Sequence, residues 1–427
     1  MITSTHITIT ISRGWLTTIG AAGIGMMLGI LYVWSVIKSG IPASWGWSHA
    51  DKALPYSVMA VSFSMAMMPA GMMQDRFGPR LVITIGGFLT GLGCIICGFG
   101  DASLPVYIVG FGLITGSGVG FAYSALAPAA MKWFPPEKTG LIVGIVVSGS
   151  GLAPLILAPI SAWTLSFFET TTPYGIVEQG VAATMIILGL VIWVVIGMLI
   201  CLIQRPPIGF IPRIDQSLER QKLQSVSMTW SQMVSTSQFW LLFCMFFAGS
   251  STGLIFIGVA AELGKSTLGK WAFLAVIVIS IGNTAGRIVA GLISDKIGRL
   301  QTLLAEFICQ GCIVSLLFWA VKSGSQSWVI IMFILFMIGL NYGANHALFP
   351  SACRDYYGIR NFGLNYGILF SAFGSAGLIM PWLNGMLQDI TGKPNISYTV
   401  IIIMMAVSAL LALVSIKIGK PRARESS

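Results

Sequence analysis

The feature that most constrains this chain is a series of twelve long apolar runs separated by short polar segments. Each run is close to the roughly 20 residues that a helix needs to cross a bilayer core. In lipid the backbone must satisfy its own hydrogen bonds, so such runs form helices. The predicted spans are residues 14–37, 54–74, 80–100, 104–130, 138–166, 181–203, 238–261, 271–292, 300–321, 327–349, 361–387 and 396–418.

The composition leads to the same class of protein. Charged residues make up 9% of the chain and hydrophobic residues 56%, whereas a typical soluble domain is about 25% charged. A soluble globule, a disordered chain and a small disulfide scaffold are therefore excluded. The first run is too long for the apolar core of a cleavable signal peptide. The sequence thus predicts an all-α membrane protein with twelve transmembrane helices.

The loop charges predict how the chain is oriented. With the N-terminus in the cytoplasm, 17 of the 24 Lys and Arg residues fall on the cytoplasmic side, six fall on the other side, and Arg287 stays inside a span. Positive loops favour the cytoplasm, so both termini are expected there, with the protein in the cell (cytoplasmic or inner) membrane. The net charge of +10 then reports topology and lipid contact rather than a nucleic-acid partner.

The two halves of the chain repeat each other. GMMQDRFGPR (71–80) is similar to GLISDKIGRL (291–300) at an offset of 220, and TGLIVG (139–144) to FGLNYG (362–367) at an offset of 223. Such duplication is found in transporters built from two parallel repeats, with the substrate site near the midplane between them. The expected organisation is two pseudo-symmetric six-helix bundles and a cytoplasmic linker, at residues 1–203, 238–427 and 204–237, respectively.

Small residues four apart are expected to bring helices into close contact, as small-xxx-small patterns do in lipid. Two examples come from the repeated segments of the fifth and eleventh spans. They are Gly140 with Gly144, and Gly363 with Gly367.

The paired loops after the second and eighth spans resemble the conserved loop motif of the major facilitator superfamily. In that family the Asp and the basic residues of this motif are thought to lock the cytoplasmic helix ends and help gate the transporter. The matching residues here are Asp75, Arg76, Asp295, Lys296 and Arg299.

A second set of motifs resembles the oxalate/formate antiporter family and the related monocarboxylate transporters. The motifs occur in order over nearly the whole chain, and together they carry more weight than any one of them alone. They are Gly29, Tyr32, Trp34 and Ser35 in the first span, DRFGPR at 75–80, Gly118 to Tyr123 followed by KWFP at 132–135, Arg287 to Arg299, HALFPS at 346–351 and NYG at 365–367.

Arg287 is the first candidate for a substrate-binding residue. An arginine is effectively always charged and costs roughly 2.5–3.5 kcal/mol at the centre of a span on insertion scales, so it is expected to face a cavity or a partner. Its planar fork matches a carboxylate, as the resemblance also implies. The alternatives are a structural ion pair or snorkelling to the cytoplasmic edge; Glu306, the nearest acid, lies about two turns inside its span. Asn283, one turn earlier, is expected to bond either the guanidinium or the substrate.

Aromatic side chains complete the predicted site. His346 is the only histidine inside a predicted span, Tyr342 lies on the same helical face, and at an offset of 223 His346 corresponds to Tyr123. A histidine there can donate to a carboxylate or titrate near neutral pH; the alternative is one satisfied by a neighbouring helix. The resemblance also implies substrate-side roles for Tyr32 and Tyr123, with ordinary packing as the alternative.

The substrate class follows from one departure from the family pattern. The oxalate transporter carries a second buried cation, a lysine on the eleventh helix, and the aligned residue here is Phe373. One fixed positive charge matches one carboxylate, so lactate, pyruvate, acetate or formate fits better than a dianion.

The sequence therefore predicts a secondary transporter of small monocarboxylates that works by alternating access, through proton symport or anion exchange. Alternatives are an exporter of another organic anion or a drug, or a transporter-like nutrient sensor. No enzyme activity, cofactor or metal is expected: Cys94, Cys97, Cys309 and Cys312 lie in apolar spans and suit packing. The expected partners are a small carboxylate, protons and the lipid bilayer, and the chain is expected to be a monomer.

Overall fold

The computed structural model describes residues 2–134, 139–171, 177–178, 180–207, 228–323, 327–358, 361–392 and 395–421. Within them, twelve helices are long and apolar enough to cross a membrane. They lie close to the twelve predicted runs, so the predicted fold class is confirmed. The largest differences are at the second span, which begins at His49, at the eighth, which continues to Ile297, and at the tenth, which continues to Tyr357.

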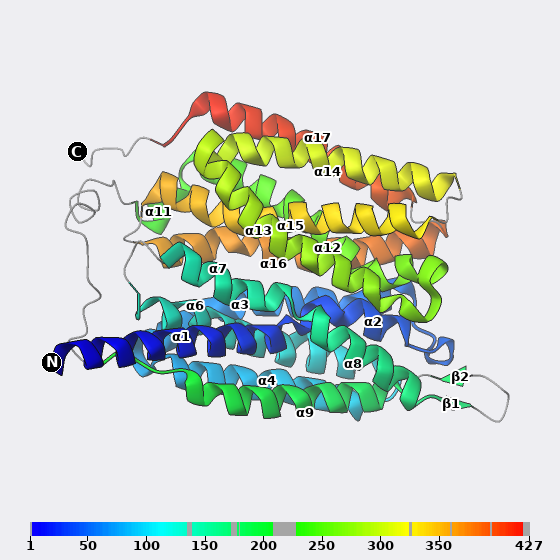
Figure 1. The fold of residues 1–427 in the computed structure, drawn as a ribbon. Helices are drawn as coiled ribbons and strands as arrows, with labels where there is room; N and C mark the ends of the chain where they lie inside the picture. The colour runs from blue at the N-terminus through cyan, green and yellow to red at the C-terminus, as the bar shows by residue number, and fades with distance from the viewer. Residues whose placement is uncertain are drawn as a thin grey trace. The chain divides into compact units, whose positions relative to one another are not determined.

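The chain divides into two compact units (Figure 1). Unit 1 comprises Met1–Trp47 and Leu54–Gln216, and unit 2 comprises Ser48–Ala53 and Ser217–Ser427. Residues 208–227, most of the predicted linker, lie outside the described part of the chain.

Several spans of unit 1 are built from more than one helical segment. The first span changes to a 3-10 segment at η1, the fourth contains the π-helical segment η3, and Pro154 opens a new helix in the fifth, as a proline can at the first helical turn. The elements are α1 (Ile2–Leu28), η1 (Gly29–Val33), α2 (Trp34–Ser39), η2 (Ala43–Trp45), α3 (His49–Phe77), α4 (Pro79–Gly98), α5 (Leu104–Tyr107), η3 (Ile108–Thr115), α6 (Gly116–Met131), α7 (Thr139–Gly151), α8 (Pro154–Phe167), α9 (Val181–Leu199) and η5 (Ile200–Leu202).

The only strands in the described residues form a short hairpin between α8 and α9. Strand β1 (Thr170–Thr171) pairs antiparallel with β2 (Val177–Glu178), with Thr170 opposite Glu178. Each strand has only two residues, so the architecture of the described chain is helical.

Unit 2 consists of longer uninterrupted helices. A capping box at Thr229 and Gln232 starts its first short helix, since each side chain satisfies a backbone amide of the other. The elements are α11 (Trp230–Val234), α12 (Ser237–Leu268), η6 (Gly269–Trp271), α13 (Phe273–Ile297), α14 (Arg299–Lys322), α15 (Trp328–Tyr357), α16 (Phe362–Thr391) and α17 (Asn395–Ile418).

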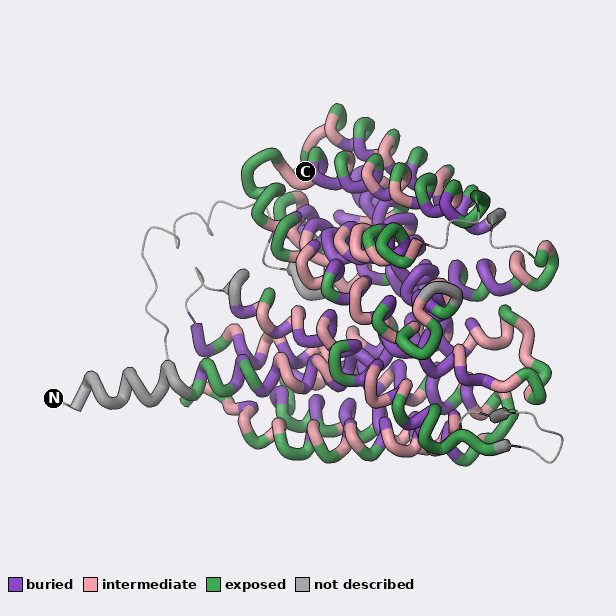
Figure 2. Tube along the Cα trace, turned by 45° about the vertical axis from the view of Figure 1, so that its right-hand side comes forward, coloured by how far each residue is buried: buried purple, intermediate pink, exposed green. Residues whose placement is uncertain are grey.

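The two units share an arrangement of helices, as their sequence repeat predicts. In Figure 1, α4 runs beside α9 in unit 1, and α14 runs beside α17 in unit 2. The spans formed by α9 and by α17 are the least buried of the twelve. In Figure 2, exposed positions follow the outer sides of the helices, where apolar residues suit contact with lipid.

The first turn of α3 lies in unit 2, where its backbone amides bind a carboxylate of α16. Asp389 accepts hydrogen bonds from the backbone amides of His49 (2.8 Å) and Ala50 (2.9 Å). A carboxylate at a helix N-terminus satisfies unpaired amides and complements the helix dipole. Gly385 allows the approach, since a Cβ there would lie 2.6 Å from the carbonyl oxygen of His49.

Candidate functional site

The helices α13 and α15, which carry most of the predicted site, cross at backbone contact. A Cβ at Gly343 would overlap the carbonyl oxygen of Asn283, and a Cβ at Gly286 would overlap that of Leu340. Gly282 and Gly339 make similar contacts with the facing backbone. Only glycine permits this approach, so these glycines set the relative position of the side chains beside them.

Arg287 and Asn283 form a polar pair on α13. The guanidinium Nε donates to Asn283 Oδ1 at 3.2 Å. Arg287 is half-buried, whereas Asn283 is 1% exposed. The Nδ2 of Asn283 has no hydrogen-bond partner among the described residues, so the pair presents a fixed positive charge and a spare amide donor.

Tyr342 and His346 meet edge to face along one side of α15. Their ring centroids are 4.8 Å apart, and His346 Nδ1 lies 3.1 Å from the carbonyl oxygen of Tyr342. A carbonyl can only accept, so this contact places a proton on Nδ1 and leaves Nε2 as the variable nitrogen. Tyr342 itself packs over Gly253 of α12, where a side chain would overlap its ring.

An apolar wall surrounds the imidazole of His346. Phe373 meets the ring edge to face at 5.6 Å, and Phe373 stacks on Phe370 at 4.8 Å. Phe246 of α12 lies 6.4 Å from the histidine ring. Phe373, which the resemblance aligns with a lysine of the oxalate transporter, is thus part of an apolar wall and is 1% exposed.

Tyr32 and Tyr123, the other two predicted tyrosines, belong to unit 1. Tyr32 is 7% exposed and lies in η1, where Gly29 lets the backbone approach Ser150 and Ala153. Tyr123 is half-buried on α6 and packs edge to face on Phe63 of α3 at 5.5 Å.

The crossing of α3 and α6 repeats two of the glycine contacts of the crossing of α13 and α15. A Cβ at Gly116 would lie 2.7 Å from the carbonyl oxygen of Met59, and one at Gly120 would overlap that of Phe63. The offset of 223 takes Gly116 and Gly120 to Gly339 and Gly343, and the offset of 220 takes their partners to Ile279 and Asn283. These are the contacts seen in unit 2. Tyr123 and His346 therefore hold equivalent positions.

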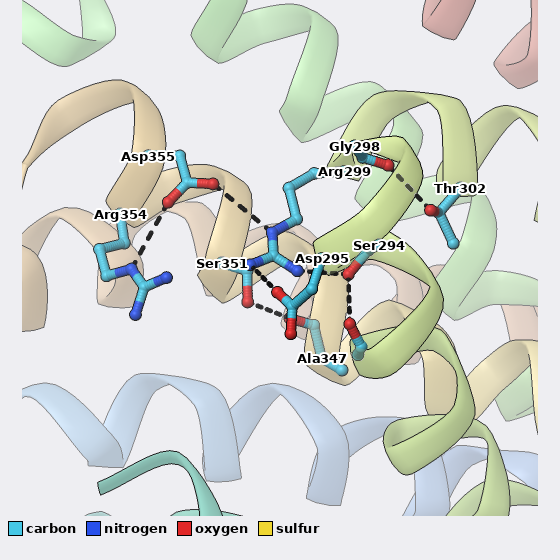
Figure 3. Close-up of polar contacts among 10 residues, drawn as sticks. Ser294, Asp295, Gly298, Arg299, Thr302, Ala347, Ser351, Arg354 and Asp355 are labelled. Atoms are coloured by element: carbon cyan, nitrogen blue, oxygen red, sulfur yellow. Dashed lines mark hydrogen bonds and ion pairs between the residues drawn. The ribbon is translucent and has the colours of Figure 1, made fainter. Parts of the chain in front are cut away.

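The repeated loop of unit 2 forms a small network of ion pairs (Figure 3). Arg299 Nη2 lies 2.6 Å from Asp295 Oδ1, and Arg299 Nε lies 3.5 Å from Asp355 Oδ2 on α15. Asp355 also meets Arg354 at 3.5 Å, and the hydroxyl of Ser294 accepts from Arg299. The sequence predicted Asp295 and Arg299 in a gating motif, but missed Asp355 and Arg354. The repeat of KWF (132–134) as DYY (355–357) was the available signal.

The repeated loop of unit 1 uses its arginines differently. Arg80 and Arg205 donate to backbone carbonyls, of Ile203 and Phe77 respectively, and Arg76 lies 5.2 Å from the ring centroid of Phe77. The side chain of Asp75 lies outside the described part of the structure. In unit 2 the corresponding Lys296 is exposed.

Both loops nevertheless have the same backbone at their turning point. Gly78 has φ 89° and ψ 169°, and Gly298 has φ 99° and ψ 153°. This conformation favours glycine. The model of the Major Facilitator Superfamily matches residues 17–381. The chain belongs to this superfamily.

Relatives and solved structures agree with the family. The chain is 27% identical over 364 residues to the uncharacterised MFS-type transporter YhjX of Escherichia coli (84% of this chain, 85% of the relative). It is 26% identical over 400 residues to the oxalate:formate antiporter of Oxalobacter formigenes (93% and 90%) and 25% identical over 422 residues to human monocarboxylate transporter 11 (97% and 84%). The E. coli xylose transporter XylE has the same fold, with a TM-score of 0.70 at 15% identity over 96% of this chain and 100% of that one.

The family decides the broad function. This is a multi-pass membrane transporter that handles small-molecule substrates, and it is not an enzyme.

Proposed function

We propose that this protein transports small monocarboxylate anions across the cell membrane. The observation that carries the proposal is the cluster on α13 and α15. It combines one fixed cation, Arg287, with an amide, two ring side chains and an apolar wall. A planar guanidinium matches a carboxylate in shape and charge, and Phe373 offers the rest of the ligand an apolar surface. The names of two relatives, an oxalate:formate antiporter and a monocarboxylate transporter, support the class.

The hydrogen bonding of His346 links carboxylate binding to a proton. With Nδ1 donating to the carbonyl of Tyr342, a neutral imidazole presents only a lone pair at Nε2, which repels a carboxylate. A proton on Nε2 supplies both a donor and a positive charge. An imidazolium at His346 and the guanidinium of Arg287 are like charges, which repel unless an anion offsets them. Proton and anion therefore favour each other's binding.

Transport by alternating access then follows from the two-bundle family fold. The substrate contacts are Arg287, Asn283, Tyr342 and His346, with Tyr32 and Tyr123 supplied by unit 1. The loop residues Asp295, Lys296 and Arg299, together with Asp75 and Arg76, gate the cytoplasmic side. The protein works as a monomer with both termini in the cytoplasm.

Purified protein in liposomes tests this proposal. Radiolabelled lactate uptake is followed first with an inward proton gradient, and then without one but with unlabelled lactate or formate inside. Uptake driven by the gradient identifies symport, and uptake only against internal anion identifies exchange. Absence of uptake of lactate, pyruvate, acetate and formate under both conditions would overturn the substrate class. Protein-free liposomes are the control.

A further inference from the structure

A buried polar ladder joins α14 to α15 away from the Arg287 pair. Its first rung is Asn341 Nδ2 donating to Gln310 Oε1 at 2.7 Å, and its second is Asn345 Nδ2 donating to Glu306 Oε1, also at 2.7 Å. All four residues are buried, with 1–7% of their surface exposed. Because the acceptors and the donors are each four residues apart on their helices, the two rungs are equivalent in geometry.

The second rung contains an acid where the first contains an amide. No ion pair of Glu306 occurs among the described residues, and its one hydrogen-bond partner there is Asn345. The charged groups and the histidine on the helices packed against α14 bond elsewhere or lie at the helix ends. They are Arg287, Asp295 and Lys296 on α13, His346, Arg354 and Asp355 on α15, and Lys417 on α17.

A carboxylate buried without a cation is costly, by several kcal/mol in effective terms. Charged groups inside a span are accordingly rare and bind ions, protons or partners. Two oxygens at this rung have no hydrogen-bond partner among the described residues, Glu306 Oε2 and Asn345 Oδ1. Both are acceptors if Glu306 is ionised, whereas one proton turns Oε2 into a donor.

Asn345 is held so that it cannot supply that missing donor itself. Its Nδ2 already donates to Glu306 Oε1 and to the carbonyl oxygen of Asn341 (3.2 Å). Its amide packs on the backbone of α12, where a Cβ at Gly249 would lie 2.6 Å from Oδ1. Both amide hydrogens are therefore in use, so within this pair a proton on the acid is the hydrogen that can satisfy a remaining oxygen.

We propose that Glu306 is a proton-binding site that carries its proton in this arrangement and is stabilised by the amide of Asn345. A protonated carboxyl has the shape and hydrogen-bonding pattern of an amide, which is what Gln310 supplies one turn away. The site holds whether or not the cargo is a monocarboxylate, since no substrate contact enters the argument.

Infrared spectroscopy of the purified full chain in mildly acidic buffer tests the proposal. A protonated carboxyl has a carbonyl stretch clear of the backbone bands, and this stretch moves in deuterated water. The wild type is expected to show the band. In Glu306→Gln the band should lose the intensity of one carboxyl group. Glu169→Gln, a matched change at an exposed glutamate, should leave the intensity unchanged. Absence of the band in the wild type, or a band of unreduced intensity in Glu306→Gln, would overturn the assignment.

A second variant and a second measurement keep the test independent of how well Glu306→Gln folds. In Asn345→Ala the carboxyl loses its partner, so the band is expected at higher frequency, and an unmoved band contradicts the pairing. Unfolding would also release this proton, so raising the pH should favour unfolding of the wild type. Glu306→Gln is expected to lose that part of the pH dependence, whereas an equal dependence in both would count against the site. Neither readout involves substrate, so uptake can fail while the proton site stands.

Discussion

The helix pairs α3–α6 and α13–α15 share the glycine contacts made by their second helices but carry different side chains at the crossing. Unit 2 has Asn283 and Arg287 on the first helix of its pair, and the sequence offset places Phe63 and Met67 there in unit 1. His346 in unit 2 likewise corresponds to Tyr123, which packs on Phe63. One backbone frame thus supports an apolar, aromatic crossing in one half and a cationic, titratable crossing in the other.

The two halves thus differ more in the side chains at the crossing than in the backbone frame that carries them. Gly116 and Gly120 share the contacts of Gly339 and Gly343, whereas Gly282 and Gly286 of α13 correspond to Ser62 and Ala66 of α3. The charge is not shared, and in the proposed function the single guanidinium of Arg287 binds a single carboxylate. The following substitutions each remove one difference between the halves or one feature that they share.

The largest effect is expected from Arg287→Gln, which makes the crossing of unit 2 neutral like that of unit 1. Removing one partner of a desolvated charge pair costs about 2–5 kcal/mol, so uptake of lactate should fall roughly 30-fold to several thousand-fold. Met67→Gln is the matched control at the equivalent position and should keep most uptake. Normal uptake by a folded Arg287→Gln protein would contradict the site.

The next effect concerns the contact that the halves share. Gly343→Ala places a methyl group on the carbonyl oxygen of Asn283, and overpacking of this kind costs about 1–3 kcal/mol. Thermal unfolding in detergent should therefore shift to lower temperature. Gly367→Ala is the control: nothing lies within 4 Å of its Cβ position, and alanine is favoured over glycine in a helix by about 0.5–1 kcal/mol. An equal loss in both variants would contradict the proposed contact.

These glycines also show how far sequence could predict the packing. The twelve spans and the repeat followed from apolar length and from the two loop motifs, and the structure has both. The small-xxx-small spacing at Gly144 and Gly367 allows close packing, but nothing in the described structure lies within 4 Å of either Cβ position. A glycine permits an approach, but which helical face meets a neighbour depends on the fold around it, and Gly339 and Gly343 stood out only once that fold was known.

The predicted site shows the same limit. The Arg287–Asn283 and Tyr342–His346 pairs followed from four-residue spacing on single helices. The sequence places Glu306 about two turns inside its span but does not show its partner, because Asn345 is 39 residues away on another helix. Asp355 was missed for the same reason, since its bond to Arg299 joins α15 to α14. Contacts within one helix are readable from spacing, whereas contacts between helices need the tertiary arrangement.

A smaller effect is expected from His346→Tyr, which gives unit 2 the residue of unit 1. A tyrosine keeps an aromatic ring and a hydroxyl donor, so uptake by exchange should change by no more than about tenfold, the worth of one ordinary hydrogen bond of about 0.5–1.5 kcal/mol. Stimulation by an inward proton gradient should disappear, because the variable nitrogen is gone. His49→Gln, a histidine outside the proposed site, is the control and should keep that stimulation. Full stimulation in His346→Tyr would remove His346 from proton coupling.

The smallest effect is expected at the repeated loops, where the halves differ in charge. Arg299 and Asp355 correspond to Pro79 and Lys132, so only unit 2 can form this ion pair. The two side chains are 17% and 32% exposed, and pairs of this kind contribute about 0.2–1 kcal/mol. A double-mutant cycle of Arg299→Ala and Asp355→Ala, measured by unfolding, should give a coupling in that range, and the same cycle at Pro79 and Lys132 should give none. Equal coupling in the two cycles would mean that the loops act alike despite their charges, and the gating role would then rest on the shared glycine turn alone.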